Sequence, residues 1–179
     1  MSDVQWRPAT RADRQALQQF TCCPDTDHPH KGDCQQPWAH EVQGYLRQQA
    51  LPYCMRNPPA RDQRLLLLED GPTLVGAAVH ALTDDDDPQG VRDRAIVAYA
   101  VALACQGKQL SNGGRASYAV LDAVVEDAVS RHEQGARIIL NALVDPPNAS
   151  SSACLRSYGL LPRGRDKTGD YILHSRRIS

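Results

Sequence analysis

The chain has 179 residues, and 20 Lys and Arg residues against 21 Asp and Glu residues give a formal net charge of −1 at pH 7. With 41% apolar residues, a chain of this length can bury a complete core without disulfide or metal crosslinks, so we expect one domain over residues 1–179. The balanced charge argues against a general nucleic-acid or membrane-surface binder. The sequence has neither an apolar run of membrane-spanning length nor a secretory signal, so we expect a cytoplasmic protein with reduced cysteines.

Apolar periodicity, interrupted by Pro, Gly and Asp, divides the N-terminal half into short elements. The predicted elements are a strand over 4–7, a helix over 11–20 capped by Thr10, a Cys-, His- and Pro-rich loop over 22–37, a helix over 38–51 that Pro52 helps to end, and a hairpin of strands 65–69 and 73–82. An acidic connector over 83–93 contains four adjacent aspartates. Because these lack the alternating spacing and the glycine of a calcium loop, we interpret them as solvated.

The C-terminal half alternates strands with helices. The predicted elements are a strand over 95–104, a polar loop over 106–114, a helix over 115–132, a strand over 137–144, a helix over 149–158 closed by Gly159, and a strand over 170–174. Strand 95–104 is apolar throughout, which is typical of the centre of a sheet covered on both faces. The order predicts an α/β or α+β fold with a mixed sheet flanked by helices.

A candidate anion site follows the central strand. The loop over 106–114 contains Gly107, Gly113 and Gly114 and leads into a helix that starts at Arg115. A helix start preceded by glycines presents backbone N–H groups and the positive end of the helix dipole, which together can bind a phosphate. Gly-rich turns of this kind also occur where nothing binds. The sequence has neither the P-loop pattern nor the dinucleotide-binding glycine fingerprint, so neither nucleotide fold is predicted.

Four stretches together resemble the GNAT superfamily of acyl-coenzyme A dependent N-acyltransferases. They are the opening strand and capped helix at 6–13, the strand pair at 65–82, the loop at 106–116 and the segment 148–160, in which Asn148 precedes Gly159-Leu160 by eleven residues. The resemblance covers nearly the whole chain. It implies a single GNAT-like domain with a mostly antiparallel sheet, in which strands 95–104 and 137–144 splay apart to form a V-shaped opening.

The resemblance also implies where coenzyme A binds. The main chain near Val101 and Leu103 and the side chain of Asn148 would contact the pantetheine arm. Backbone amides of the loop would contact the diphosphate: Gln109, Leu110, Ser111, Asn112, Gly113, Gly114 and Arg115. This register places Asn112 at the first glycine of the family's motif, and Asn is the next best residue for a left-handed conformation. A register on Gln106 would instead place Gln109 and Ser111 at the two glycine positions.

The chemistry has three requirements: the amine must be held near the thioester, it must be deprotonated, and the oxyanion of the tetrahedral intermediate must be stabilised. The family often places a tyrosine seven residues after the asparagine as the acid for the departing thiolate. Here Leu155 holds that position, and Tyr158 lies three residues further on. Tyr158 is therefore our candidate catalytic residue, with packing of the helix end as the alternative. Tyr99, Asp93 or a relayed water could serve as the base.

Cysteines and histidines concentrate between residues 22 and 40. They are Cys22, Cys23, His28, His30, Cys34 and His40. Thiolates and imidazoles suit tetrahedral zinc, but no Cys-x-x-Cys or His-x3-His spacing is present, so zinc remains an alternative to an unmetallated acceptor loop. We interpret the following Trp38 and Tyr45 as core contacts rather than substrate stackers.

The sequence therefore predicts an enzyme that moves an acetyl group from acetyl-CoA to a primary amine of a small molecule or a protein, by direct attack in a ternary complex. The alternative is a coenzyme A binding or regulatory module that keeps the fold and has lost catalysis, favoured by the missing tyrosine and the altered glycines. We expect an amine-bearing acceptor as partner, no membrane, no general nucleic-acid binding and a homodimer as one assembly compatible with the sequence.

Overall fold

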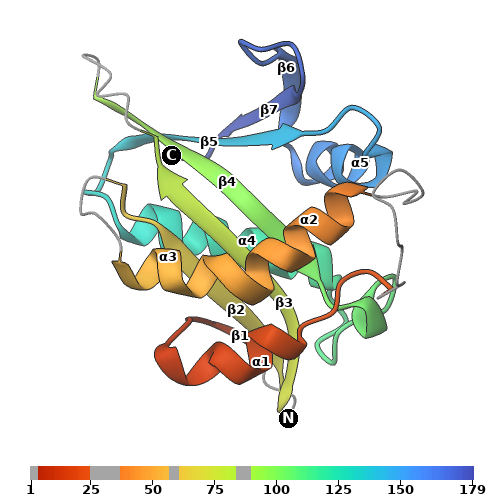
Figure 1. Cartoon of the computed structure of the whole chain (residues 1–179). Coiled ribbons are helices and arrows are strands. Elements are labelled where there is room, and N and C mark those ends of the chain that lie inside the picture. Colours follow the sequence, from red (N-terminus) through yellow and green to blue (C-terminus); the bar gives the residue numbers. More distant parts are fainter. Residues whose placement is uncertain (1–3, 25–36, 57–60, 84–89) are drawn as a thin grey trace.

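The structure is a computed structural model, and it describes residues 4–24, 37–56, 61–83 and 90–179 (Figure 1). The strands are β1 (Val4–Pro8), β2 (Arg64–Asp70), β3 (Thr73–Leu82), β4 (Val91–Val101), β5 (Arg137–Val144), β6 (Leu161–Arg165) and β7 (Ile172–Arg177). The helices are η1 (Arg11–Asp13), α1 (Arg14–Gln19), α2 (Pro37–Tyr45), η3 (Leu46–Ala50), α3 (Leu51–Arg56), η4 (Leu103–Cys105), α4 (Ala116–Ser130) and α5 (Ala149–Tyr158). In this part of the chain, no helix is both long and apolar enough to cross a membrane.

The seven strands form one mixed sheet in the order β1-β2-β3-β4-β5-β7-β6. The pair of β4 and β5 is parallel, and the other pairs are antiparallel. Strand β4 lies at the centre, as its apolar sequence predicts. The prediction of a mixed, mostly antiparallel sheet flanked by helices is therefore confirmed.

Helices cover both faces of the sheet, and β2 shows how the sequence permits this. Its four consecutive leucines, 65 to 68, are all buried. Leu66 and Leu68 pack in one core with residues of α4, whereas Leu65 and Leu67 pack in a second core with residues of α1 and η3. Figure 1 shows α1, α2 and α3 on one face and α4 on the other. A strand buried on both faces needs a continuous apolar run, which these leucines supply.

Helix α4 lies very close to β3. A Cβ added to Gly76 would come within 2.4 Å of Val120 Cγ2 and 3.2 Å of the Ala100 carbonyl oxygen. Glycine is therefore required at this position for the helix to approach the sheet this closely.

Two boundaries differ from the sequence prediction. Strand β4 begins at Val91, four residues before the predicted start, and it ends at Val101 with Leu103–Cys105 in a 3-10 turn. The sequence did not indicate this start, because polar residues alternate with apolar ones there. One of these polar residues, Arg94, is fully buried and pairs with a charged partner. Strand β6 was not predicted, since every one of its residues is exposed and it contains a Pro and a Gly.

Pro52 does not end the second helix as predicted. The helix continues through Pro52 to Arg56, and the segment before it, Leu46–Ala50, is π-helical. Proline has no N–H for the carbonyl of Gln48 four residues earlier, and its ring clashes with that carbonyl in a regular α-helix. A wider π turn accommodates both effects, so the proline changes the helix type instead of terminating the helix.

A buried charged cluster joins β3, β4 and α4 at the end of the sheet where β4 begins. Arg94 Nε donates to His80 Nδ1 at 3.0 Å, and His80 Nε2 lies 3.0 Å from the Asp127 carboxylate. The Arg94 guanidinium also pairs with Asp62 at 3.0 Å, and Arg131 reaches the same carboxylate at 2.6 Å. Because arginine only donates, His80 must accept at Nδ1 and carry its proton on Nε2, where Asp127 accepts it.

Candidate functional site

The central strands part halfway along β4. Strand β4 pairs with β5 from Val91 opposite Arg137 to Ile96 opposite Ala142, and the pairing stops there. Beyond this point β4 stays with β3, while β5 continues beside β7 to Val144. The divergence of β4 and β5 is visible in Figure 1. The V-shaped opening predicted from the resemblance is confirmed.

A β-bulge in β4 marks the point of separation. On β3, Val79 pairs with Ala98 and His80 with Ile96, so Val97 is the extra residue on β4. A bulge bends its strand and increases the local twist, which turns β4 away from β5. Val97 is 49% exposed, and its side chain lines a cavity at the point of separation.

The opening contains a cavity of about 210 Å³, which is lined by residues of both strands and of three flanking segments. Its walls are formed by Trp38, Glu41, Val42, Ile96, Val97, Ala98, Tyr99, Ala142, Leu143, Val144, Asp145, Asn148, Ser151, Leu155 and Tyr171. Strand ends and the start of α5 therefore meet helix α2 across the gap.

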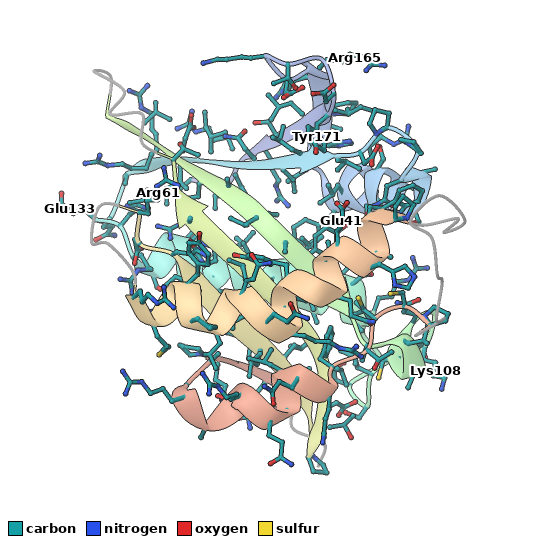
Figure 2. All side chains as sticks on the ribbon, viewed as in Figure 1. Glu41, Arg61, Lys108, Glu133, Arg165 and Tyr171 are labelled. Atoms are coloured by element: carbon teal, nitrogen blue, oxygen red, sulfur yellow. The ribbon has the colours of Figure 1, made fainter. Side chains whose placement is uncertain are left out.

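The cavity wall combines carboxylates with aromatic rings. Glu41 is exposed on α2, and Asp145 is half-buried just after β5. Trp38 and Tyr171 lie in the same wall. Figure 2 shows Glu41 on the α2 side of the opening and Tyr171 on the β7 side. Carboxylates and aromatic faces both attract an ammonium group, so this mouth is electrostatically suited to a cationic amine.

Tyr99 is, with Tyr171, one of two tyrosines in the described wall of the cavity. It comes from β4, just beyond the bulge, and its hydroxyl donates to the Ser151 carbonyl oxygen of α5 at 3.4 Å. Burial, together with the nearby Cys154 thiol, raises the pKa of Tyr99 above its ordinary value. The hydroxyl therefore keeps its proton at neutral pH, which suits an acid better than a base.

Asn148 lies in the cavity wall and also starts α5. Its Oδ1 accepts the Ser151 N–H at 3.1 Å and the Ser150 hydroxyl at 3.1 Å. Asparagine is a preferred N-cap because its oxygen satisfies an otherwise unpaired helical N–H. Among the predicted pantetheine contacts, Asn148 is the one whose side chain lines the cavity.

The other two predicted pantetheine contacts lie where β4 ends. The Ala102 N–H donates to the Val75 carbonyl of β3 at 2.9 Å, so by alternation the main chain of Val101 faces the opposite edge, toward the opening. The Val101 carbonyl accepts from Gln106 Nε2 at 3.1 Å. The Leu103 N–H donates to the Thr21 carbonyl at 2.7 Å, so this amide is already used within the protein.

The loop predicted to hold the diphosphate is folded onto itself. Gln109 and Arg115 form an isolated antiparallel bridge. The Leu110 N–H donates to the Gly114 carbonyl, and the Gly113 N–H donates to the Leu110 carbonyl, both at 2.8 Å. Gly113 has a φ of +83°, a left-handed conformation that favours glycine. These bonds close a small ring just before α4.

Side chains occupy two further amides of the same loop. The Ser111 N–H donates to Asp70 Oδ2 at 2.9 Å, and the Ser111 hydroxyl donates to the other oxygen of that carboxylate. The Gly114 N–H donates to Asn112 Oδ1 at 2.9 Å. The Arg115 guanidinium lies over the Tyr118 ring, 5.7 Å from its centroid. The structure thus brings the predicted diphosphate residues together, with Asp70 as a carboxylate neighbour that the sequence did not reveal.

Tyr158 lies at the far end of α5 and faces α4. Its hydroxyl donates to Asp122 Oδ1 at 2.6 Å, and its ring packs against Tyr118 at 5.8 Å and under the Arg176 guanidinium at 5.4 Å. Burial, followed by the bond to Asp122, raises the pKa of Tyr158. Tyr158 is not part of the cavity wall. Its role as the acid stays a prediction, and its observed contacts are those of a packing residue.

The cysteine and histidine cluster falls only partly within the described residues, because His28, His30 and Cys34 lie outside them. Cys23 Sγ lies 3.6 Å from His40 Nδ1, while the Cys22 thiol donates to the Ala39 carbonyl. Burial raises the pKa of Cys22 to about 12, which disfavours the thiolate that zinc requires. No group of three or more metal-binding side chains occurs in the residues that the structure describes, so the zinc alternative gains no support.

Sequence reasoning missed the α2 wall of the cavity. Trp38 was interpreted as a core contact, yet it lines the opening together with Glu41 and Val42. These residues follow a helical spacing of three and four, so periodicity could have placed them on one face. That this face of α2 covers the opening, however, follows only from the bulge at Val97 and the separation of β5 from β4.

Comparisons with known proteins find similarity in structure but none in sequence. No protein family and no curated protein matches the sequence. Aminoglycoside acetyltransferase AAC(6')-Ib in complex with coenzyme A aligns with a TM-score of 0.63 and 16% identity, over 98% of this chain and 95% of that one. A protein from Desulfovibrio desulfuricans assigned to the GNAT family aligns with a TM-score of 0.58 and 17% identity, over 99% of this chain and 100% of that one.

A third solved structure contains the acetylated cofactor. The structure of yncA from Salmonella typhimurium with acetyl-CoA aligns with a TM-score of 0.51 and 16% identity, over 99% of this chain and 95% of that one. The alignments span almost the whole of each chain, so the likeness includes the parted strands as well as the outer elements. The chain therefore has the fold of the GNAT acetyltransferases.

Proposed function

We propose that the protein transfers an acetyl group from acetyl-CoA to a primary amine. The observation that carries this proposal is the end of pairing between β4 and β5 at Ile96 and Ala142, which leaves a 210 Å³ cavity between two central strands. A free strand edge can hydrogen-bond an extended amide chain such as the pantetheine arm, in the manner of an added strand. Two structural neighbours contain coenzyme A or acetyl-CoA, which supports the choice of donor.

The wall of the cavity supplies groups for each step. The amine enters as an ammonium ion attracted by Glu41 and Asp145, and one of these carboxylates, directly or through water, accepts its proton. The neutral nitrogen attacks the thioester carbonyl carbon, so a C–N bond forms and the C–S bond breaks. The departing thiolate takes a proton from a phenol, and the phenolate regains a proton from the acetylated nitrogen, which completes the amide. We propose Tyr99 for this role because it lines the cavity from β4 and its hydroxyl reaches α5.

The sequence-based candidate Tyr158 makes a competing prediction, which substitution separates. If Tyr99 is the acid, Tyr99→Phe lowers kcat by about 10²-fold, within the usual range for general acid catalysis, and leaves acetyl-CoA affinity unchanged. Tyr158→Phe is the matched control, because it also removes one phenolic hydroxyl, from a tyrosine of α5 that does not line the cavity. A loss of kcat confined to Tyr158→Phe would restore the sequence-based assignment.

The decisive experiment has two parts. Calorimetric titration of the purified protein with acetyl-CoA tests donor binding, and release of free thiol over a broad panel of small amines and peptides tests turnover. We expect binding, and thiol release with at least one cationic amine. Binding without turnover on any amine supports the alternative of a non-catalytic coenzyme A binding module, which the closed contacts of loop 109–114 favour. No binding overturns both proposals.

A further inference from the structure

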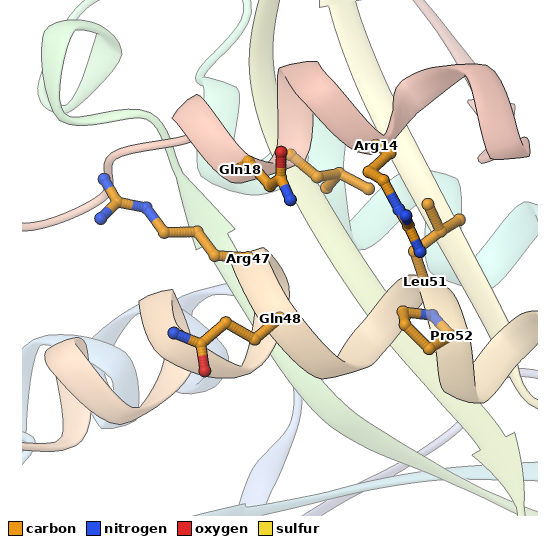
Figure 3. A pocket seen from close by; sticks show the side chains of 7 residues that line it. Arg14, Gln18, Arg47, Gln48, Leu51 and Pro52 are labelled. Carbon is orange, nitrogen blue, oxygen red and sulfur yellow. The ribbon is translucent and has the colours of Figure 1, made fainter.

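A second hollow of the molecule lies away from the parted strands, between α1 and the helix formed by η3 and α3. Two adjoining hollows of about 590 Å³ and 470 Å³ share Arg14, Leu51 and Pro52 and together form one continuous depression, here named the α1–α3 groove. Figure 3 shows the Arg14 side chain extending from α1 toward Leu51 and Pro52 on the opposite side. None of the residues that line the groove belongs to the cavity between β4 and β5.

The rim of the groove is basic and uncompensated. Arg11, Arg14 and Arg56 line it, and all three are exposed. In the described ranges none of their guanidinium groups has a hydrogen-bonding or ion-pair partner, whereas Arg47, the fourth arginine of the lining, donates to the Phe20 carbonyl and the Thr21 hydroxyl. By contrast, the guanidinium groups of Arg7 and Arg94 elsewhere in the molecule are paired with carboxylates. Among the residues with a described position, no Asp or Glu lines the groove, although the whole chain has a net charge of −1.

The floor of the groove is aliphatic. Leu17 and Leu51 form its base with exposed fractions of 1% and 6%, and Pro52 and Met55 lie beside them. Met55 is 42% exposed, which is unusual for an apolar side chain facing a hollow of this size. Gln18 and Gln48 contribute amide groups that can both donate to and accept from a peptide main chain.

We infer that the α1–α3 groove binds a segment of a partner protein in which acidic residues alternate with aliphatic ones. Guanidinium groups bind carboxylates in a planar, bidentate geometry, so the arginine rim selects Asp and Glu. The leucine, proline and methionine floor buries the aliphatic side chains of the same segment. The two hollows together offer more room than a single small anion fills, which suits several residues of a peptide segment.

The composition of the groove disfavours a nucleic acid. Single-stranded nucleic acids bind by stacking their bases on aromatic rings beside basic residues, and no aromatic side chain is among the described residues that line this groove. A phosphate backbone would also leave the aliphatic floor without a partner. An oligonucleotide therefore serves as the contrasting probe.

The test measures fluorescence anisotropy of a short labelled peptide with alternating glutamate and leucine, in the absence of coenzyme A. We expect saturable binding that weakens with added salt. The double variant Arg14→Glu/Arg56→Glu should reduce affinity by at least about tenfold, while Arg163→Glu/Lys167→Glu, the same charge change on exposed residues near β6, should leave it unchanged. A peptide of glutamates alone should bind more weakly, because it cannot use the floor.

Three outcomes would overturn the inference: no binding of the alternating peptide, an equal loss in both double variants, or tighter binding of a single-stranded oligonucleotide through the same arginines. Unchanged thermal unfolding of both variants shows that the fold is intact. Because no coenzyme A is present, the result does not depend on whether the protein transfers an acetyl group.

Discussion

The two halves of β4 lie in opposite surroundings. From Val91 to Ile96 the strand pairs with β5, from Arg94 onward it pairs with β3 as well, and the buried Arg94 ties it to β3 and to the residues before β2. From Val97 to Val101 it keeps only β3 and faces a cavity. The first half is held by strong charged contacts, while the second leaves main-chain groups along an open edge.

The difference shows how an opening can persist in the middle of a sheet. Two adjacent strands would gain hydrogen bonds by pairing along their whole length, so something must hold them apart. The bulge at Val97 bends β4, and the charged cluster fixes the first half so that the bend moves the second half only. Charged residues that look unsuited to a central strand therefore determine where the opening begins.

Loss of the Arg94 side chain should have the largest effect on this arrangement. Arg94→Met removes the fully buried cation from Asp62, which keeps only the more exposed Arg131, and leaves the buried His80 Nδ1 without its donor; breaking a buried ion pair typically costs about 3–5 kcal/mol. We expect a decrease of this size in the free energy of unfolding, measured by urea denaturation. We also expect weaker acetyl-CoA binding, because the register of β4 is no longer fixed.

Arg131→Met is the matched control. Arg131 contacts the same Asp62 carboxylate at 2.6 Å, but its side chain is 37% exposed whereas that of Arg94 is 0% exposed. Exposed ion pairs contribute about 0–1 kcal/mol, so this variant should lose much less stability. Equal losses in the two variants would show that burial of Arg94 is not what holds the first half of β4.

Filling the second half should affect ligand binding without affecting the fold. Leu143→Trp replaces a leucine side chain, which lines the cavity and is 53% exposed, with a larger indole. Since space is available, stability should change by no more than about 0.5 kcal/mol, while acetyl-CoA affinity should fall by about tenfold or more, measured by calorimetry. Leu161→Trp, at a leucine of β6 with 52% exposure, should change neither. Unchanged affinity in Leu143→Trp would place the donor elsewhere.

The sequence alone was enough to predict most of the sheet. The apolar run after Ala95 and the leucines of β2 indicate buried strands, because a strand covered on both faces is usually apolar along its length. The resemblance to GNAT proteins predicted the parted strands. It could not indicate Val97 as the bulge, because any residue in an apolar run can be the unpaired one.

The site was less predictable than the fold, for two physical reasons. The cavity wall contains residues that are distant in sequence and lie near one another only because the strands part: Glu41, Asp145 and Tyr171. Asp70 reaches Ser111 from a hairpin turn, and no local pattern links those two residues. Tyr99 was considered only as a base, and its burial, which favours the protonated phenol, follows from the fold.

The charged cluster should also make stability depend on pH. Burial lowers the pKa of His80 in the folded state, and protonation at Nδ1 would break the bond from Arg94. The unfolded histidine titrates near 6.5, so below that pH the unfolded state binds the proton first and stability falls by up to about 1.4 kcal/mol per pH unit. Partial burial lowers the pKa of His132 as well, in the same direction.

The measurement is the slope of unfolding free energy between about pH 6.5 and 5.5, where we expect a loss of about 1 kcal/mol. His80→Gln should reduce the slope even though it also lowers stability overall, and His132→Gln should retain the part due to His80. A slope unchanged by His80→Gln would mean that another group titrates in this range.

The smallest expected effect concerns the loop that follows the open half of β4. Asp70→Ala removes the carboxylate that accepts from the Ser111 N–H and hydroxyl. If those groups serve the diphosphate, their release and the loss of a negative charge should tighten acetyl-CoA binding by about threefold, since one exposed hydrogen bond contributes only about 0.5–1.5 kcal/mol. Asp166→Ala removes another carboxylate that accepts a main-chain N–H, from Tyr171, and should have no such effect. Weaker binding in Asp70→Ala would mean that the carboxylate keeps loop 109–114 in the conformation that binds the donor. A charged contact would then position this loop, as it does the first half of β4.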